Sequence, residues 1–108
     1  MKYTVFTTEK AEGDLKEILK YLAYTLKAGE TAIKQIERIE SAILSLDEMP
    51  ERFRIYDEEP WRTRKLRVMS VDNYLVFYIA KKEEKSVTVL RVMYGRRDIS
   101  TRLKDENK

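Results

Sequence analysis

The chain has 108 residues, of which 43% are hydrophobic and 38% charged, and this composition predicts one soluble globular domain rather than a disordered chain. The absence of cysteine and histidine excludes disulfides, thiolate zinc sites, cysteine nucleophiles and the commonest general base near neutral pH. Residues 1–60 hold 9 basic and 13 acidic side chains, a net charge of −4, whereas residues 61–108 hold 13 basic and 6 acidic ones, a net charge of +7. The total is +3, and its uneven distribution predicts one basic face.

The chain opens with a predicted strand and helix. Lys2–Phe6 contains β-branched and aromatic residues typical of a strand. Thr7 or Thr8 can cap a helix whose apolar positions recur every three or four residues up to about Leu26. Gly29 is a natural C-cap for that helix.

A second amphipathic helix is expected from residue 30 or 31 to residue 48 or 49, where Pro50 ends it. Two such helices joined by a few residues form an antiparallel hairpin. The following segment, Met49–Trp61, has two prolines and an acidic cluster, and we interpret it as an ordered surface loop.

Three apolar runs, Leu66–Val71, Tyr74–Ala80 and Val87–Tyr94, predict an antiparallel meander. Side chains that face helices should be apolar. This predicts the helix-facing set Leu66, Val68, Leu75, Phe77, Ile79, Leu90 and Val92. The opposite, uncovered face would then display Lys65, Arg67, Tyr74, Tyr78 and Arg91.

The expected fold is α+β, in the order β-α-α-β-β-β, with the helical hairpin packed on one face of a small antiparallel sheet. The pattern leaves open whether Lys2–Phe6 joins the sheet at an edge or at its centre. Residues 1–108 form a single domain, and about 100–108 are a polar tail with one possible helical turn that frays.

Cations beside tyrosine rings on the uncovered face suit single-stranded RNA or DNA, because phosphates attract cations and unpaired bases stack on rings. The alternative interpretation is a solvated sheet face with long basic side chains. Gly95-Arg96-Arg97-Asp98 offers two arginines that could each bind a phosphate. Its structural alternative is a turn in which Asp98 pairs with one arginine or caps a following turn.

Trp61, beside Arg62, Arg64 and Lys65, is interpreted as a structural plug at one end of the core. The sequence has no carboxylate pair, Ser/His/Asp set, glycine-rich phosphate loop or cluster with metal-ligand spacing. It also has no run of the roughly 20 apolar residues that span a bilayer. We therefore expect a cytoplasmic protein with no metal, cofactor, small-molecule ligand or membrane partner.

In element order and in several short motifs the chain resembles the RelE/ParE superfamily of bacterial type II toxin–antitoxin toxins. The resemblance covers most of the chain and is closest to the ParE-like ending. The motifs that carry it are the helix exit Glu48-Met49-Pro50-Glu51-Arg52, the segment Arg64-Lys65-Leu66-Arg67, the strand Asn73-Tyr74-Leu75-Val76-Phe77-Tyr78 and the ending Val89–Asp98.

The resemblance implies a growth-inhibiting toxin with a cognate antitoxin as its partner. The mRNA-cleaving RelE branch uses basic residues that match Lys65, Arg67 and Arg97. The chain departs from that branch because Asn73-Tyr74 replaces an arginine and Leu103 stands near an expected tyrosine. The ParE branch, whose members poison DNA gyrase, fits the pattern better.

Three hypotheses follow: a ParE-like toxin that binds DNA gyrase without chemistry of its own, a ribosome-dependent mRNA interferase, and a non-toxic nucleic-acid-binding or scaffold domain with the same fold. The enzyme hypothesis assigns catalysis to Lys65, Arg67 and Arg97. The predicted surface for target or antitoxin comprises Arg64, Lys65, Arg67, Tyr74, Tyr78, Arg91, Tyr94, Arg96 and Arg97.

Overall fold

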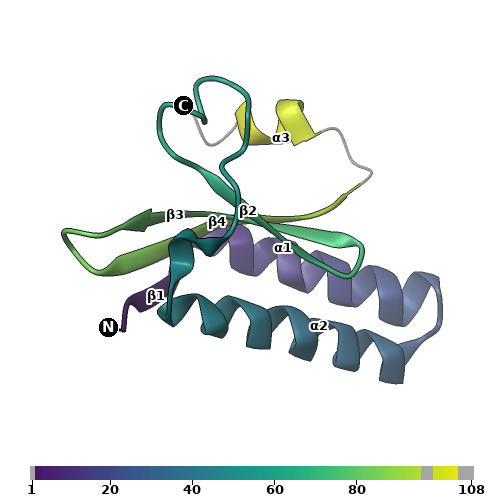
Figure 1. Ribbon diagram of the computed structural model, residues 1–108. Helices are drawn as coiled ribbons and strands as arrows, with labels where there is room; N and C mark the ends of the chain where they lie inside the picture. The colour runs from purple at the N-terminus through teal and green to yellow at the C-terminus, as the bar shows by residue number, and fades with distance from the viewer. Residues whose placement is uncertain (1, 96–98, 105–108) are drawn as a thin grey trace.

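The computed structural model describes residues 2–95 and 99–104 (Figure 1). The elements are, in order, β1 (Thr4–Thr7), α1 (Glu9–Lys20), the π-helical turn η1 (Tyr21–Thr25), α2 (Gly29–Leu44), the 3₁₀ turns η2 (Ser45–Asp47) and η3 (Pro50–Arg52), β2 (Arg67–Val71), β3 (Tyr74–Lys81), β4 (Ser86–Tyr94) and α3 (Ile99–Lys104). The predicted β-α-α-β-β-β order is confirmed, followed by a short helix. Within the described ranges no helix is both long and apolar enough to cross a membrane.

The four strands form one sheet in the order β1-β4-β3-β2. The meander β2-β3-β4 is antiparallel, as predicted, but β1 lies at an edge and pairs parallel to β4, with Thr4 opposite Ser86. The sheet is therefore mixed rather than wholly antiparallel. Antiparallel pairing is natural between strands joined by short turns, whereas β1 reaches the meander only through the helical hairpin, which permits a parallel partner.

Thr8 caps α1 as the sequence predicts. Its hydroxyl oxygen accepts a hydrogen bond from the Ala11 amide at 3.1 Å, and the hydroxyl donates to the Leu90 carbonyl at 3.0 Å. The cap therefore also attaches α1 to β4. The predicted C-cap at Gly29 is wrong, because Lys27 takes the left-handed conformation (φ 51°) and Gly29 begins α2.

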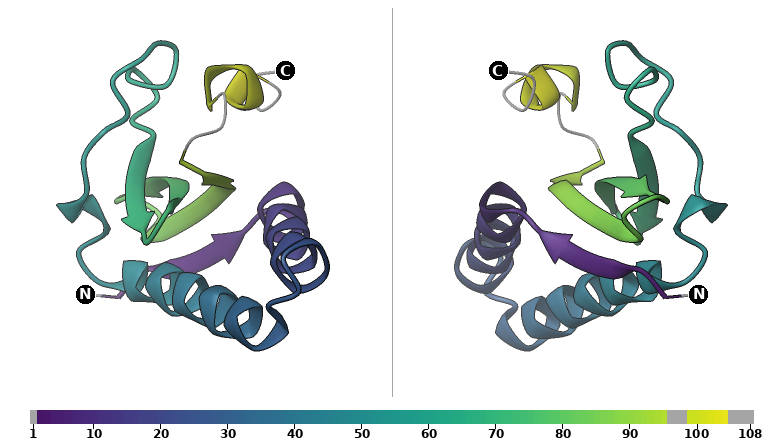
Figure 2. Two further views of the ribbon diagram at one scale, coloured as in Figure 1. Left: turned by 90° about the vertical axis from the view of Figure 1, so that its right-hand side faces the viewer. Right: turned by 90° about the vertical axis from the view of Figure 1, so that its left-hand side faces the viewer.

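The helical hairpin covers one face of the sheet, and its core contains the buried residues Ala11, Ile39, Ile43, Leu46, Met69, Tyr74, Val76, Tyr78, Val87, Val89 and Val92. Figure 2 shows α1 and α2 on one side of the sheet, and the loop between η3 and β2 together with α3 on the other side. That loop and α3 form a second core from Trp61, Leu66, Val68, Phe77, Met93 and Leu103. The expected polar tail thus begins with a helix that buries Leu103.

Most of the predicted face assignment is therefore wrong. Val92 faces the helices, but the other six apolar residues assigned there belong to or pack against the second core. Both faces of the sheet are covered, so its strands carry apolar side chains on both sides. The alternation of apolar and polar residues that would identify the helix-facing side is therefore missing. A register shift between Phe77 and Tyr78 also breaks the two-residue period, since Tyr78 pairs with Val89 and Phe77 with Arg91.

The segment Glu48–Arg52, one of the motifs that the chain shares with the RelE/ParE superfamily, has a structural role in this fold. The Arg52 guanidinium donates to the backbone carbonyls of Ser45, Glu48 and Met49, where the helical run ends. Met49 takes a left-handed conformation (φ 47°), so Pro50 can begin the next turn. The arginine thus caps the end of the hairpin rather than facing a ligand.

Gly95 closes β4 at a place of close backbone approach. Its amide donates to the Asn73 carbonyl oxygen at 2.9 Å, and a Cβ at this position would lie 3.3 Å from that oxygen. The φ angle of Gly95 is not positive, so the position favours glycine because a side chain would crowd the Asn73 carbonyl.

Tyr78 lies on the helix side of the sheet, where its hydroxyl donates to the Pro50 carbonyl at 2.6 Å. Burial raises the pKa of Tyr78 to about 12. The unfolded chain would ionise this tyrosine near pH 10, so the folded state loses relative stability between about pH 10 and 12. We expect Tyr78→Phe to lower the free energy of unfolding by about 1 kcal/mol at pH 8.

We further expect the difference between wild type and Tyr78→Phe to shrink at pH 11, because the variant lacks the ionisation that destabilises the wild-type fold. Urea unfolding at both pH values measures it. A difference that stays constant between pH 8 and pH 11 would show that Tyr78 titrates like an exposed tyrosine.

Candidate functional site

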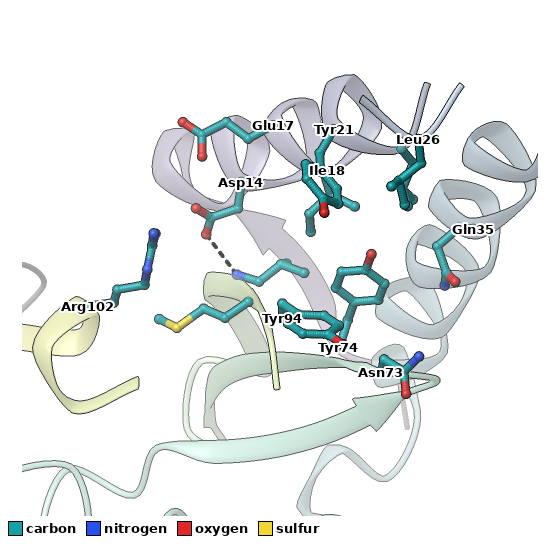
Figure 3. Close-up of a pocket in the computed structure, with 13 residues that line it drawn as sticks. Asp14, Glu17, Ile18, Tyr21, Leu26, Gln35, Asn73, Tyr74, Tyr94 and Arg102 are labelled. Atoms are coloured by element: carbon teal, nitrogen blue, oxygen red, sulfur yellow. Dashed lines mark hydrogen bonds between the residues drawn. The ribbon is translucent and has the colours of Figure 1, made fainter. Parts of the chain in front are cut away.

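A groove of about 520 Å³ lies between α1 with η1, the adjoining ends of β3 and β4, and α3 (Figure 3). Its apolar part is lined by Ile18, Tyr21, Leu22, Leu26, Tyr74 and Tyr94. Its polar part includes Asp14 and Glu17 from α1 and Arg102 from α3. The groove combines an apolar middle with charged groups at the α3 end.

The apolar middle exists because the stripe of the first helix extends beyond the buried sheet. Ile18, Leu22 and Leu26 recur every four residues and share one face. Of the residues that continue this surface, Tyr21 is 52% exposed and Leu26 is 54% exposed. Large apolar side chains left exposed together are typical of a docking surface.

Two predicted tyrosines meet on the sheet side of this groove. The rings of Tyr74 and Tyr94 pack edge to face, with centroids 5.7 Å apart. Burial raises the pKa of Tyr74, with smaller contributions from Tyr94 and Tyr21. Both rings offer apolar surface with hydroxyl groups, which suits an amphipathic partner segment.

Arg91 forms a buried ion pair below the groove, so its predicted place on an uncovered face is wrong. Its Nε and Nη2 donate to the two Asp14 carboxylate oxygens at 2.8 and 2.9 Å, and the Val92 amide donates to Asp14 at 2.9 Å. Its Nη1 also donates to the Arg102 carbonyl at 3.2 Å. Arg91 thereby joins α1, β4 and α3 instead of contacting solvent.

Arg67 is also held by its own chain. Its Nη1 donates to the carbonyls of Glu51 at 3.1 Å and Phe53 at 2.6 Å, and its Nη2 lies 3.8 Å from the Glu51 carboxylate. The side chain is only 16% exposed. This guanidinium attaches η3 and the residue after it to β2, where the sequence predicted an open cationic position.

The remaining predicted residues lie apart from the groove or outside the described residues. Lys65 is exposed just before β2, in a left-handed conformation (φ 60°). Arg64 is exposed and its guanidinium lies 4.9 Å from the centroid of the Trp61 ring. Trp61 itself is buried, which confirms its structural interpretation. Arg96, Arg97 and Asp98 are outside the described residues.

The structure thus brings together Tyr74 and Tyr94 at the groove, with Arg91 beneath it, and leaves Lys65 and Arg67 on another part of the fold. Sequence analysis missed the contributions of α1 and α3. One signal was present: Asp14 follows Ala11 by three residues, so a carboxylate falls on the apolar face of the helix. A charge in that place requires a buried partner.

Comparisons with known proteins agree on one group of relatives. A family model described as the ParE toxin of the type II toxin–antitoxin system parDE matches residues 5–99. A search of curated proteins gives no match. Among solved structures, the chromosomal ParDE system of P. aeruginosa is similar at 20% identity, with a TM-score of 0.70, over 86% of this chain and 96% of that one.

Two further structures carry RelE or RelBE names. The toxin–antitoxin complex RelBE2 of Mycobacterium tuberculosis is 21% identical, with a TM-score of 0.60, over 87% of this chain and 99% of that one. A free E. coli RelE variant is 14% identical, with a TM-score of 0.62, over 99% and 98%. At these identities the structures establish the shared fold and leave the two branches unseparated.

Proposed function

The chain belongs to the family of ParE toxins of type II toxin–antitoxin systems, and on that premise we propose that it arrests growth by binding DNA gyrase. We propose further that a cognate antitoxin neutralises it by docking in the groove. The ParE family match over residues 5–99 supports the gyrase assignment. The antitoxin assignment is supported by the solved relatives, several of which are toxin–antitoxin complexes.

The observation that carries inhibition by binding, rather than by RNA cleavage, is the state of Arg67. An interferase of the kind the sequence suggested would need this arginine to face RNA. Here two backbone carbonyls occupy one guanidinium nitrogen and the side chain is largely covered. A guanidinium committed to its own chain stabilises the fold and is poorly placed to stabilise a developing charge on a phosphate.

The competing function is ribosome-dependent mRNA cleavage. It is favoured by the structural likeness to E. coli RelE, and Lys65 is exposed as such a site would require. The two functions make opposite predictions in purified systems, so one pair of assays separates them.

We expect the purified chain to inhibit supercoiling of relaxed plasmid DNA by gyrase and to leave ribosome-bound mRNA intact. Arg67→Lys should keep the inhibition if the variant folds, because the chain does not use that residue at its target. Cleavage of mRNA in the ribosomal A site, lost in Lys65→Ala, would instead establish the interferase. Unchanged supercoiling at high toxin excess would reject the gyrase proposal.

The groove is proposed for the antitoxin because its apolar surface is exposed and continuous. Toxin–antitoxin partners must associate tightly, and tight association requires apolar anchors in a pocket that excludes water. Tyr94 from the predicted set belongs to this surface. Arg64 and Lys65, on another part of the fold, are proposed for the cellular target.

A further inference from the structure

Among the described residues, the charged side chains that line the α3 end of the groove are Asp14, Glu17 and Arg102. Arg91 lies beneath them, and Asp14 and Arg91 neutralise each other. Asp14 and Arg91 are each only 8% exposed and share two hydrogen bonds, while the Val92 amide adds a third to the same carboxylate. Three hydrogen bonds therefore hold the Asp14 carboxylate inside the protein. Its charge is balanced by the Arg91 guanidinium, so it adds little attraction for another cation at the groove.

Arg102 also lines this end of the groove, and its backbone is fixed from two sides. The Arg91 guanidinium donates to its carbonyl at 3.2 Å, and the next residue, Leu103, is fully buried in the second core. These contacts set the rotation of α3 about its axis. They leave the Arg102 side chain as part of the groove lining, beside Asp14 in Figure 3.

In the part of the chain that the structure describes, no carboxylate lies within ion-pair distance of the Arg102 guanidinium. Glu17 lines the same groove but is not paired with it. A cation beside an apolar wall attracts an opposite charge more strongly than one in open solvent, since a bound segment displaces water there. The arrangement favours a partner with an acidic side chain at this end.

We propose that Arg102 is a specificity-determining residue, which selects an amphipathic antitoxin segment by one acidic side chain, and that the buried Asp14–Arg91 pair positions it. The proposal rests on the groove being the antitoxin site. The segment places aliphatic or aromatic side chains over the wall formed by Ile18 and Tyr74, and its Asp or Glu at the α3 end.

The test measures the affinity of the full-length chain for its full-length cognate antitoxin, at low and at high salt. We expect Arg102→Met to weaken binding roughly tenfold at low salt and less at high salt. Arg102→Glu should weaken it further, and an acidic-to-lysine change in the antitoxin should restore it. Arg54→Met, which removes an exposed cation outside the groove, is the matched control and should bind as wild type.

The positioning role is tested by a double-mutant cycle. In an Asp14→Asn background the Arg91 guanidinium loses its counter-charge, so Arg102 is less well placed and Arg102→Met should then cost only about twofold. Asp72→Asn is the control, because Asp72 makes the same two-bond contact with Arg38 on the surface. If Asp14→Asn does not fold, as judged by circular dichroism, Arg91→Lys serves in the same cycle. Additive effects of the two changes would reject the positioning role.

A further variant separates charge selection by Arg102 from the premise that the antitoxin docks in the groove. Leu26→Glu places a charge in the apolar part of the groove. If it abolishes binding while both Arg102 variants bind as wild type at both salt concentrations, the antitoxin docks here but charge selection by Arg102 is wrong. If Leu26→Glu also binds as wild type, the docking site itself is wrong.

Discussion

Replacing Arg91 with methionine is expected to lower the free energy of unfolding by about 3–5 kcal/mol, since it leaves the Asp14 carboxylate buried without its counter-charge. The pair lies at 2.8 Å and each partner is 8% exposed, so water cannot replace the lost guanidinium without opening the groove floor. The loss also removes the hydrogen bond to the Arg102 carbonyl, which attaches α3. Urea unfolding followed by circular dichroism measures the change.

Two controls make the Arg91 prediction specific. Arg38→Met breaks an exposed pair with the same two-bond geometry to Asp72, and we expect a far smaller change there because solvent screens both charges. The double variant Asp14→Leu/Arg91→Met should be more stable than Arg91→Met alone, because no isolated charge remains buried. Equal losses in Arg91→Met and Arg38→Met would show that the Asp14–Arg91 pair is effectively solvated.

The order of elements was predictable because local signals specify it. The threonine after the first strand caps α1, and the three-and-four-residue apolar spacing predicted both helices. The second helix ends earlier than predicted, at Leu44 instead of residue 48 or 49, and a 3₁₀ turn follows it. The strands β2, β3 and β4 begin and end within one residue of the predicted runs. Each of these features depends on neighbours in the chain, so the sequence contains the information directly.

The arrangement of side chains across the sheet was not predictable in the same way. Tyr78 appears polar in the pattern but is fully buried, because its hydroxyl meets the Pro50 carbonyl from a segment 28 residues away. Arg67 appears exposed but is satisfied by the carbonyls of Glu51 in η3 and of Phe53 directly after it. Polar groups can face a core when a distant segment supplies their partners, and such partners leave no local periodic trace.

The candidate site was predictable only in part, for the same physical reason. Tyr74 was expected on an uncovered basic face and Tyr94 on the surface for target or antitoxin, and the two rings meet at the groove wall with residues of α1. The groove arises where the apolar stripe of the first helix continues past the sheet, and its depth depends on where α3 packs. Both conditions depend on how distant segments pack together, which the local sequence pattern does not indicate.

The second large effect is expected from Leu26→Glu, which should weaken antitoxin binding by about a hundredfold or more if the groove is the docking site. A carboxylate at this position must lose its water when an apolar partner segment covers it, and among the described residues no cation lines that part of the groove to compensate. Leu26 is 54% exposed in the free chain, so the glutamate should be tolerated by the fold itself. Calorimetric titration of the purified proteins measures the affinity.

Leu44→Glu is the matched control for Leu26→Glu. Leu44 is also an exposed leucine at a helix end, 67% accessible, but it belongs to α2 and does not line the groove. We expect this variant to bind the antitoxin as tightly as wild type, and both variants to unfold at similar urea concentrations. Equal weakening by the two substitutions would mean that the antitoxin recognises the outer surface of the helical hairpin, because only that surface is altered in both.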